Sequence, residues 1–215
     1  MVDSGDGARP TGGLLTPGTR VYRFIVLLFV SLLTFGSYFA YDSVGAIAPT
    51  LVTALGIGRE AIGQMYTLYS VAAILSVFIG GMLIDRIGTR RASLIFSALV
   101  TLGALIVAIA PTLWLLYFGR FIFGWGSESL VVAQSAIFAR WFKGKELALS
   151  FGIGLTISRL GTLFSFNTEA LIADYFKDYR YALWAAVLFC VLSLIANLVY
   201  NLLDKRGERA LALKE

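Results

Sequence analysis

Long apolar stretches separated by short polar segments make up the chain from residue 22 to residue 203. A helix that crosses the hydrocarbon core of a bilayer needs about 20 such residues. Six stretches reach this length and predict spans at about residues 22–51, 61–84, 92–110, 113–141, 147–171 and 181–203. Because the connections between them are short, adjacent spans are expected to run antiparallel. The predicted fold is an all-α integral membrane bundle of six transmembrane helices.

The segments outside the spans are short. Residues 1–20 hold several glycines and prolines, which predicts a flexible tail. The first apolar run is too long for the core of a cleavable signal peptide. Residues 204–215 carry charges of both signs and are expected to be a tail, a helix end or the start of a linker.

Composition supports the membrane assignment and excludes several classes of protein. Hydrophobic residues make up 58% of the chain and charged residues 14%, with a mean hydropathy of +0.80, whereas soluble domains are about 25% charged. Only 4 prolines and 1 cysteine are present, which excludes collagen and disulfide scaffolds. The absence of histidine removes His-based metal sites and Ser-His or Cys-His nucleophiles. We expect no cofactor, no metal and no enzymatic activity.

The basic residues predict an orientation, because basic loops resist translocation. Thirteen of the 18 lysines and arginines flank the same ends of the predicted spans, while Arg59, Lys177 and Arg180 flank the opposite ends. Both termini are therefore expected in the cytoplasm. The net charge of +5 does not indicate nucleic-acid binding, since the basic residues do not form one surface.

The connection between the second and third spans reads GGMLIDRIGTRR from residue 80 to residue 91. It resembles the signature loop of the major facilitator superfamily, Gly-x-Leu-x-Asp-Arg-x-Gly-x-Arg-Arg in loose form. The matching positions are Gly81, Leu83, Asp85, Arg86, Gly88, Arg90 and Arg91. A positive-inside loop with a turn glycine is the plainer alternative, but seven matches at fixed spacing favour the resemblance.

Each part of this motif has a physical role. Gly81 is expected to let helices pack closely, and Gly88 to form a tight turn. Asp85 can accept charge-assisted hydrogen bonds from an arginine or a helix N-terminus. The resemblance implies that the motif locks one conformation of a carrier and releases in the other.

Two further resemblances lie in the fourth and fifth spans. Residues 120–126 are similar to the superfamily pattern Arg-x-x-x-Gly-x-Gly, with Arg120 as its arginine. Residues 37–42, 126–134, 141–147 and 158–161 resemble the branch of the superfamily that contains a lysosomal dipeptide uniporter. That resemblance implies a carrier for dipeptides or related zwitterions. The fifth span lacks the Gly-Pro pair of drug/proton antiporters, which disfavours drug export.

Charged side chains inside the spans are the main candidates for a site, because the bilayer penalises a charge without a partner or a watery cavity. Glu128 and Arg159 are expected at the same level near the midplane, where carriers place their substrates. They either form a structural ion pair or line a cavity and divide a zwitterion, with Glu128 taking the ammonium and Arg159 the carboxylate. The branch resemblance favours the second alternative, because its acidic and basic binding positions fall on these residues.

Asp42 and Arg120 are expected at a second common level. A structural ion pair is the favoured hypothesis for them, and proton coupling through Asp42 is the alternative. Further polar groups inside the spans are candidate substrate contacts, each of which is more often an interhelical hydrogen bond. The candidates are Tyr38, Tyr41, Tyr69 and Gln134, with Tyr66 as a possible neighbour.

The resemblance also raises the question of a second half, because superfamily carriers have two six-helix bundles with substrate between them. The expected partners are the lipid bilayer, a small-molecule substrate and a second bundle, supplied by another copy or by a separate chain; truncation at the central linker is the third possibility. Alternatives to a dipeptide carrier are a proton-coupled carrier of organic anions and a six-helix membrane partner that does not transport.

One feature of the sequence bears on the compartment. An acidic dileucine signal is not evident, since Pro10 lies four positions before Leu14. This slightly favours a prokaryotic inner membrane over an endolysosomal membrane.

Overall fold

The computed structural model describes residue 17 and residues 19–212, all of whose regular structure is helical. The predicted tail at residues 1–20 therefore lies almost entirely outside the described residues. The helices are α1 (Arg20–Leu32), α2 (Phe35–Ala46), α3 (Ala48–Leu55), α4 (Arg59–Ile109), α5 (Leu113–Trp141), α6 (Lys145–Phe176) and α7 (Tyr179–Ala212). The predicted all-α membrane fold is confirmed.

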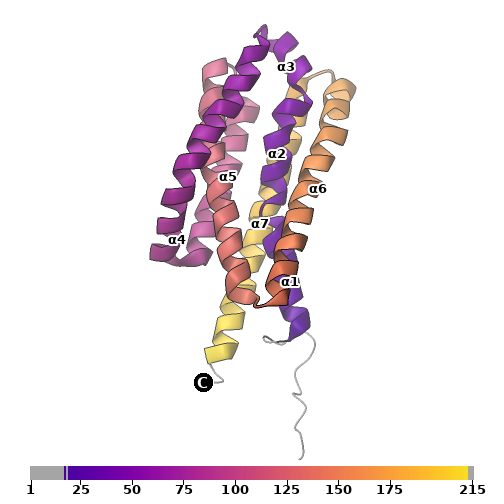
Figure 1. Ribbon diagram of the computed structural model, residues 1–215. Helices are drawn as coiled ribbons and strands as arrows, with labels where there is room; N and C mark the ends of the chain where they lie inside the picture. The colour runs from indigo at the N-terminus through magenta and orange to yellow at the C-terminus, as the bar shows by residue number, and fades with distance from the viewer. Residues whose placement is uncertain (1–16, 18, 213–215) are drawn as a thin grey trace, which may run out of the picture.

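Five helical segments of the described chain are long and apolar enough to cross a membrane. The longest of them is α4, whose 51 residues would extend about 77 Å as a straight helix. It instead turns back at Gly88, where φ is 81° and ψ is 159°, a conformation open essentially only to glycine. Figure 1 shows the two arms of α4 running antiparallel. The second and third predicted spans correspond to these two arms.

The first predicted span, expected to be continuous from 22 to 51, is divided into α1, α2 and α3. At the first break, the amide of Gln134 donates to the carbonyl of Val30 over 3.0 Å and to the hydroxyl of Thr34 over 3.1 Å. A side chain thus satisfies a backbone group at the break, as a membrane interior requires. At the second break Pro49 lacks the N–H that would continue the helix.

The helix α2 packs closely against both α6 and α7. A Cβ atom added to Gly161 of α6 would lie 2.4 Å from the carbonyl oxygen of Phe35, and one added to Gly36 of α2 would lie 2.3 Å from that of Phe189 in α7. Only glycine allows backbones to approach this closely. The packing fixes α2 in the bundle through close backbone contacts with α6 and α7.

The two ends of the bundle differ in their connections (Figure 1). The start of α1, the Gly88 turn, the α5–α6 connection and the end of α7 lie at one end. The α3–α4, α4–α5 and α6–α7 connections lie at the other end. The segments predicted to be cytoplasmic therefore share one end, while the orientation of that end in the cell remains a prediction. Helix α7 continues to Ala212, beyond the expected span end at 203.

Candidate functional site

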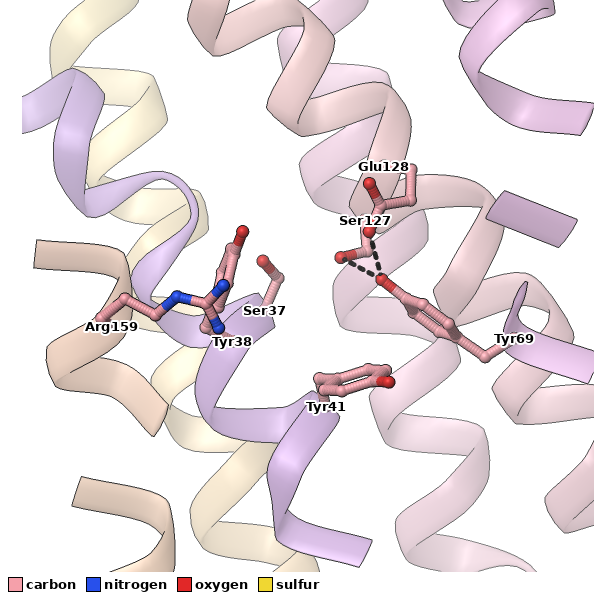
Figure 2. Close-up of a pocket in the computed structure, with 7 residues that line it drawn as sticks. All are labelled: Ser37, Tyr38, Tyr41, Tyr69, Ser127, Glu128 and Arg159. Atoms are coloured by element: carbon pink, nitrogen blue, oxygen red, sulfur yellow. Dashed lines mark hydrogen bonds between the residues drawn. The ribbon is translucent and has the colours of Figure 1, made fainter. Parts of the chain in front are cut away.

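A cavity of about 250 Å³ opens between α2, α4, α5 and α6. Its lining residues are Ser37, Tyr38, Tyr41, Tyr69, Ser127, Glu128 and Arg159. Figure 2 shows Arg159 and Tyr38 on one side of this space, with Glu128, Ser127 and Tyr69 on the opposite side. Four helices therefore bring five of the predicted candidate residues together around one space.

The acidic wall is built by α4 and α5. The Tyr69 hydroxyl donates to Oε1 of Glu128 over 2.5 Å, and it also lies 3.3 Å from Oγ of Ser127. Glu128 is half-buried, while Tyr69 and Ser127 are buried. Because a charge-assisted hydrogen bond is strong and directional, Tyr69 fixes the Glu128 carboxylate at the cavity wall. The second carboxylate oxygen has no protein donor among the described hydrogen bonds.

The basic wall is built by α6 and α2. The guanidinium carbon of Arg159 lies 5.2 Å from the centroid of the Tyr38 ring, within the range of a cation–π interaction. The other helices of the bundle leave the Arg159 side chain exposed. No hydrogen bond or ion pair to another described residue occupies its guanidinium. Its fork of N–H donors is therefore available for a carboxylate.

An aromatic cluster lies behind the cavity and encloses Arg120. This arginine is only 1% exposed, and its N–H groups donate to the carbonyls of Ala40 and Tyr41, both over 3.3 Å. The rings of four aromatic residues lie 5.1–5.5 Å from its guanidinium carbon. They are Tyr41, Tyr66, Tyr69 and Phe123. Two of them, Tyr41 and Tyr69, also line the cavity, so Arg120 supports the cavity wall from behind.

Neither of the ion pairs considered from the sequence is formed in the described part of the chain. Every contact within 4.0 Å between opposite charges there lies at the end that holds the Gly88 turn. Arg120 is bound by carbonyls and aromatic rings in place of Asp42. Glu128 and Arg159 face each other across the cavity unpaired, as in the substrate-binding alternative.

Gln134 was expected to contact substrate but is not among the residues that line the cavity. Its amide is used at the break between α1 and α2. The sequence-based choice also missed Ser37 and Ser127, which contribute hydroxyls to the lining. Each directly precedes a chosen residue, Tyr38 or Glu128, but adjacency alone does not indicate which neighbour turns toward the cavity.

The signature motif is joined to α7 through charges. Arg90 contacts Asp204 over 3.5 Å and Glu208 over 2.7 Å. Arg140 contacts the same two carboxylates, and the Trp141 indole donates to Asp204 over 2.8 Å. The roles of Arg140 and Asp204 were not expected, because they lie far from the motif in sequence.

Of the remaining motif residues, Asp85 and Gly81 lack the contacts expected for them within the described structure, whereas Gly88 forms its expected turn. Asp85, Arg86 and Arg91 are exposed, and no described residue forms a hydrogen bond or ion pair with them. Gly81 was expected at a close helix contact, yet a Cβ atom added there would meet nothing within 4 Å. Gly80 makes the close contact instead, since its added Cβ would lie 2.6 Å from Oγ of Ser129. The expected turn at Gly88 is present.

Comparison with known families decides the relationship suggested by these motifs. The family model described as Major Facilitator Superfamily matches residues 30–215. The chain belongs to the major facilitator superfamily. This membership assigns it to a family of membrane transporters, in agreement with the cavity and the motif that joins the arms of α4.

Curated relatives extend the match over nearly the whole chain. The lysosomal dipeptide transporter MFSD1 of Danio rerio is 37% identical over 97% of this chain and 49% of its own length. The protein of the same name from Homo sapiens is 37% identical over 95% of this chain and 46% of its own length. The chain thus spans about half the length of these relatives. Because these relatives are named as lysosomal, they do not support the slight preference for a prokaryotic inner membrane.

Solved structures confirm the fold. The peptide transporter POT in complex with sulfate superimposes with a TM-score of 0.70 at 22% identity, over 81% of this chain and 37% of that chain. The POT family transporter PepTSo gives a TM-score of 0.70 at 19% identity, with the same coverage. At this level of identity the similarity concerns the fold alone.

Proposed function

We propose that this bundle contributes the substrate site of a carrier for small zwitterionic solutes, with dipeptides as the main class. The observation that supports this most strongly is the opposed arrangement of Glu128 and Arg159, each unpaired with the other, across one cavity. The carboxylate of Glu128 binds the substrate ammonium, and the guanidinium of Arg159 binds the substrate carboxylate in a fork geometry. The dipeptide transporters among the curated relatives favour the same substrate class.

The aromatic residues complete the proposed site. The rings of Tyr38, Tyr41 and Tyr69 offer apolar and polarisable surface for the substrate between its two charges, while Ser37 and Ser127 offer hydroxyls. Aromatic surface combined with placed polar groups is typical of small-molecule sites. Because backbone carbonyls and rings already bind Arg120, we assign that residue to the support of the wall and not to the substrate.

The proposal includes a second six-helix half and alternating access. Helix α6 is the least covered of the five candidate spans. In its most apolar 18-residue stretch 22% is buried, whereas at least 44% is buried in the corresponding stretch of each other span. Its exposed face includes the polar residues Thr156, Arg159 and Asn167. Polar side chains are unfavourable against lipid, so we place a second bundle over this face, with the substrate between the halves.

Flux measurements test the proposed function. Proteoliposomes that contain the protein, with its second half where that is a separate chain, are expected to show saturable dipeptide flux. The variants E128Q and R159Q are expected to lose most of this flux, because each leaves one substrate charge without its partner. The exposed residues Glu60 and Arg180 provide matched controls, E60Q and R180Q, that should retain it. Absence of saturable flux in every assembly would contradict the proposal.

Crosslinking in native membranes tests the identity of the second half. A homodimer predicts a crosslinked species of twice the 23.4 kDa chain mass, whereas a separate second half predicts a species of a different mass. A chain that never pairs with another copy would exclude the homodimer.

A further inference from the structure

A buried carboxyl group without a partner lies in α6, on the side of the bundle opposite the Gly88 turn. The Glu169 side chain is 0% exposed, and neither of its carboxylate oxygens has a hydrogen-bond partner. No described cation forms an ion pair with it. This arrangement is unlike that of Glu128, which faces a cavity and accepts a hydrogen bond from Tyr69.

The helices packed on α6 provide no compensating charge. The titratable groups of α2 are Tyr38, Tyr41 and Asp42, and those of the first half of α7 are Tyr179, Arg180, Tyr181 and Cys190. None of them forms a described hydrogen bond or ion pair with Glu169. In α1, Arg20 and Arg23 pair with Glu146 at the other end of the bundle. In α5, Arg120 and Glu128 belong to the cavity wall and its aromatic support.

Two further buried hydroxyl groups without hydrogen-bond partners lie on α6 near Glu169. The hydroxyl oxygens of Thr162 and Ser165 are buried and also lack hydrogen-bond partners. Together with Ser158 they precede Glu169 at intervals of four, three and four residues, which places all four side chains on one face of the helix. Ser158 lies 2.6 Å from the Thr34 hydroxyl and directly precedes Arg159. The polar stripe therefore leads from Glu169 to the level of the cavity.

The energetic cost decides the protonation state of the carboxyl group. An ionised carboxylate that is buried without a partner costs several kcal/mol, and such a group takes up a proton instead. We propose that Glu169 is a proton-binding site whose carboxyl group holds its proton at neutral pH in this conformation, and that Thr162 and Ser165 extend the site toward Ser158. The ligand of this site is a proton, which differs from the zwitterion assigned to the cavity.

Infrared spectroscopy of the purified full chain tests this proposal without any transport measurement. At neutral pH the wild type is expected to show the carbonyl-stretch band of a protonated carboxylic acid. E169Q should lose this band, and the exposed-residue control E60Q should keep it. A wild type without the band, or an E169Q variant that retains it unchanged, would overturn the proposal. Should E169Q fail to fold, E169D takes its place and is expected to shift the band. An unshifted band in E169D would also overturn the proposal.

The pH dependence of stability gives an independent test. Unfolding exposes Glu169 to water, where its carboxyl group is ionised at neutral pH, so the folded wild type binds one proton more than the unfolded chain. Its melting temperature should therefore fall relative to that of E169Q as the pH rises from about 5 toward neutral. A difference between the two proteins that stays constant over this range would overturn the proposal.

Discussion

The hydroxyl of Tyr69 donates a 2.5 Å hydrogen bond to Glu128 and joins the first arm of α4 to α5 at the cavity wall. Since Tyr69 also packs on the aromatic cluster around Arg120, one ring connects the support of the site to its acidic group. The position of the Glu128 carboxylate is thus set by a neighbour that carries no charge itself.

Replacement of this hydroxyl tests its role. Y69F keeps the ring and its packing but removes the donor to Glu128. A hydrogen bond to a charged group contributes about 1.5–3 kcal/mol, so we expect dipeptide binding to weaken by about tenfold or more. Competition binding on purified protein measures this effect, with Y175F as control because Tyr175 is 81% exposed. Equal affinities for Y69F and wild type would show that the hydroxyl does not position the carboxylate.

The support of the cavity wall is tested at Arg120. R120M keeps much of the side-chain volume but removes the two hydrogen bonds that the guanidinium donates to the carbonyls of Ala40 and Tyr41. Because a hydrogen bond from a charged donor contributes about 1.5–3 kcal/mol, we expect a loss of about 3 kcal/mol in stability, seen as a lower melting temperature. D42N should change the melting temperature little, because Asp42 does not pair with Arg120 in the described structure. A large destabilisation by D42N would instead indicate an ion pair between these residues.

The turn between the two arms of α4 is tested by a pair of glycine substitutions. G88A forces a side chain into a backbone conformation with φ of 81°, at a cost of about 1–3 kcal/mol. G81A is the matched control in the same motif, because an added Cβ atom meets nothing within 4 Å there. Thermal unfolding should show a lower melting temperature for G88A alone. Equal behaviour of the two variants would contradict the geometry of the turn.

The ion pairs of Arg90 and Arg140 with Asp204 and Glu208, near the Gly88 turn, predict unequal effects of replacing the two carboxylates. Asp204 is 0% exposed and contacts Arg90, Arg140 and Trp141. D204N should therefore cost about 1–3 kcal/mol, because it weakens the hydrogen bonds of a buried charged group. E208Q should cost about 1 kcal/mol or less, because the Glu208 side chain is 48% exposed. Chemical denaturation in mild detergent compares the two, and a similar loss for both would reject Asp204 as the anchor.

Some of the site could be predicted from the sequence because the bilayer makes buried charge conspicuous. Glu128 and Arg159 are charges within apolar stretches, and tyrosines inside the spans are polar groups that can line the same cavity. Sequence spacing places residues along a helix, but it does not define how neighbouring helices are rotated against each other. For this reason Gln134 was expected in the cavity although it holds the α1–α2 break, and Gly81 was expected at the contact that Gly80 makes.

The missed contacts depend on approaches between segments distant in sequence. Arg90 and Asp204 meet only because α7 passes the Gly88 turn, and Asp204 lies in the part of α7 that extends beyond the expected span end at 203. The carbonyls that bind Arg120 lie on α2, so no charge pattern in the sequence could indicate them. A search for acidic partners of arginine therefore selected Asp42.

The most direct test of the central claim matches each charge of the ligand to one residue. Binding of a free dipeptide, its N-acetyl form and its C-terminal amide is measured on wild type, E128Q and R159Q by the rise in melting temperature. Wild type should prefer the free dipeptide, E128Q should no longer distinguish it from the N-acetyl form, and R159Q should no longer distinguish it from the amide. Variants that bind the dipeptide yet retain the full wild-type preference against both blocked forms would contradict the assignment of Glu128 to the ammonium and Arg159 to the carboxylate.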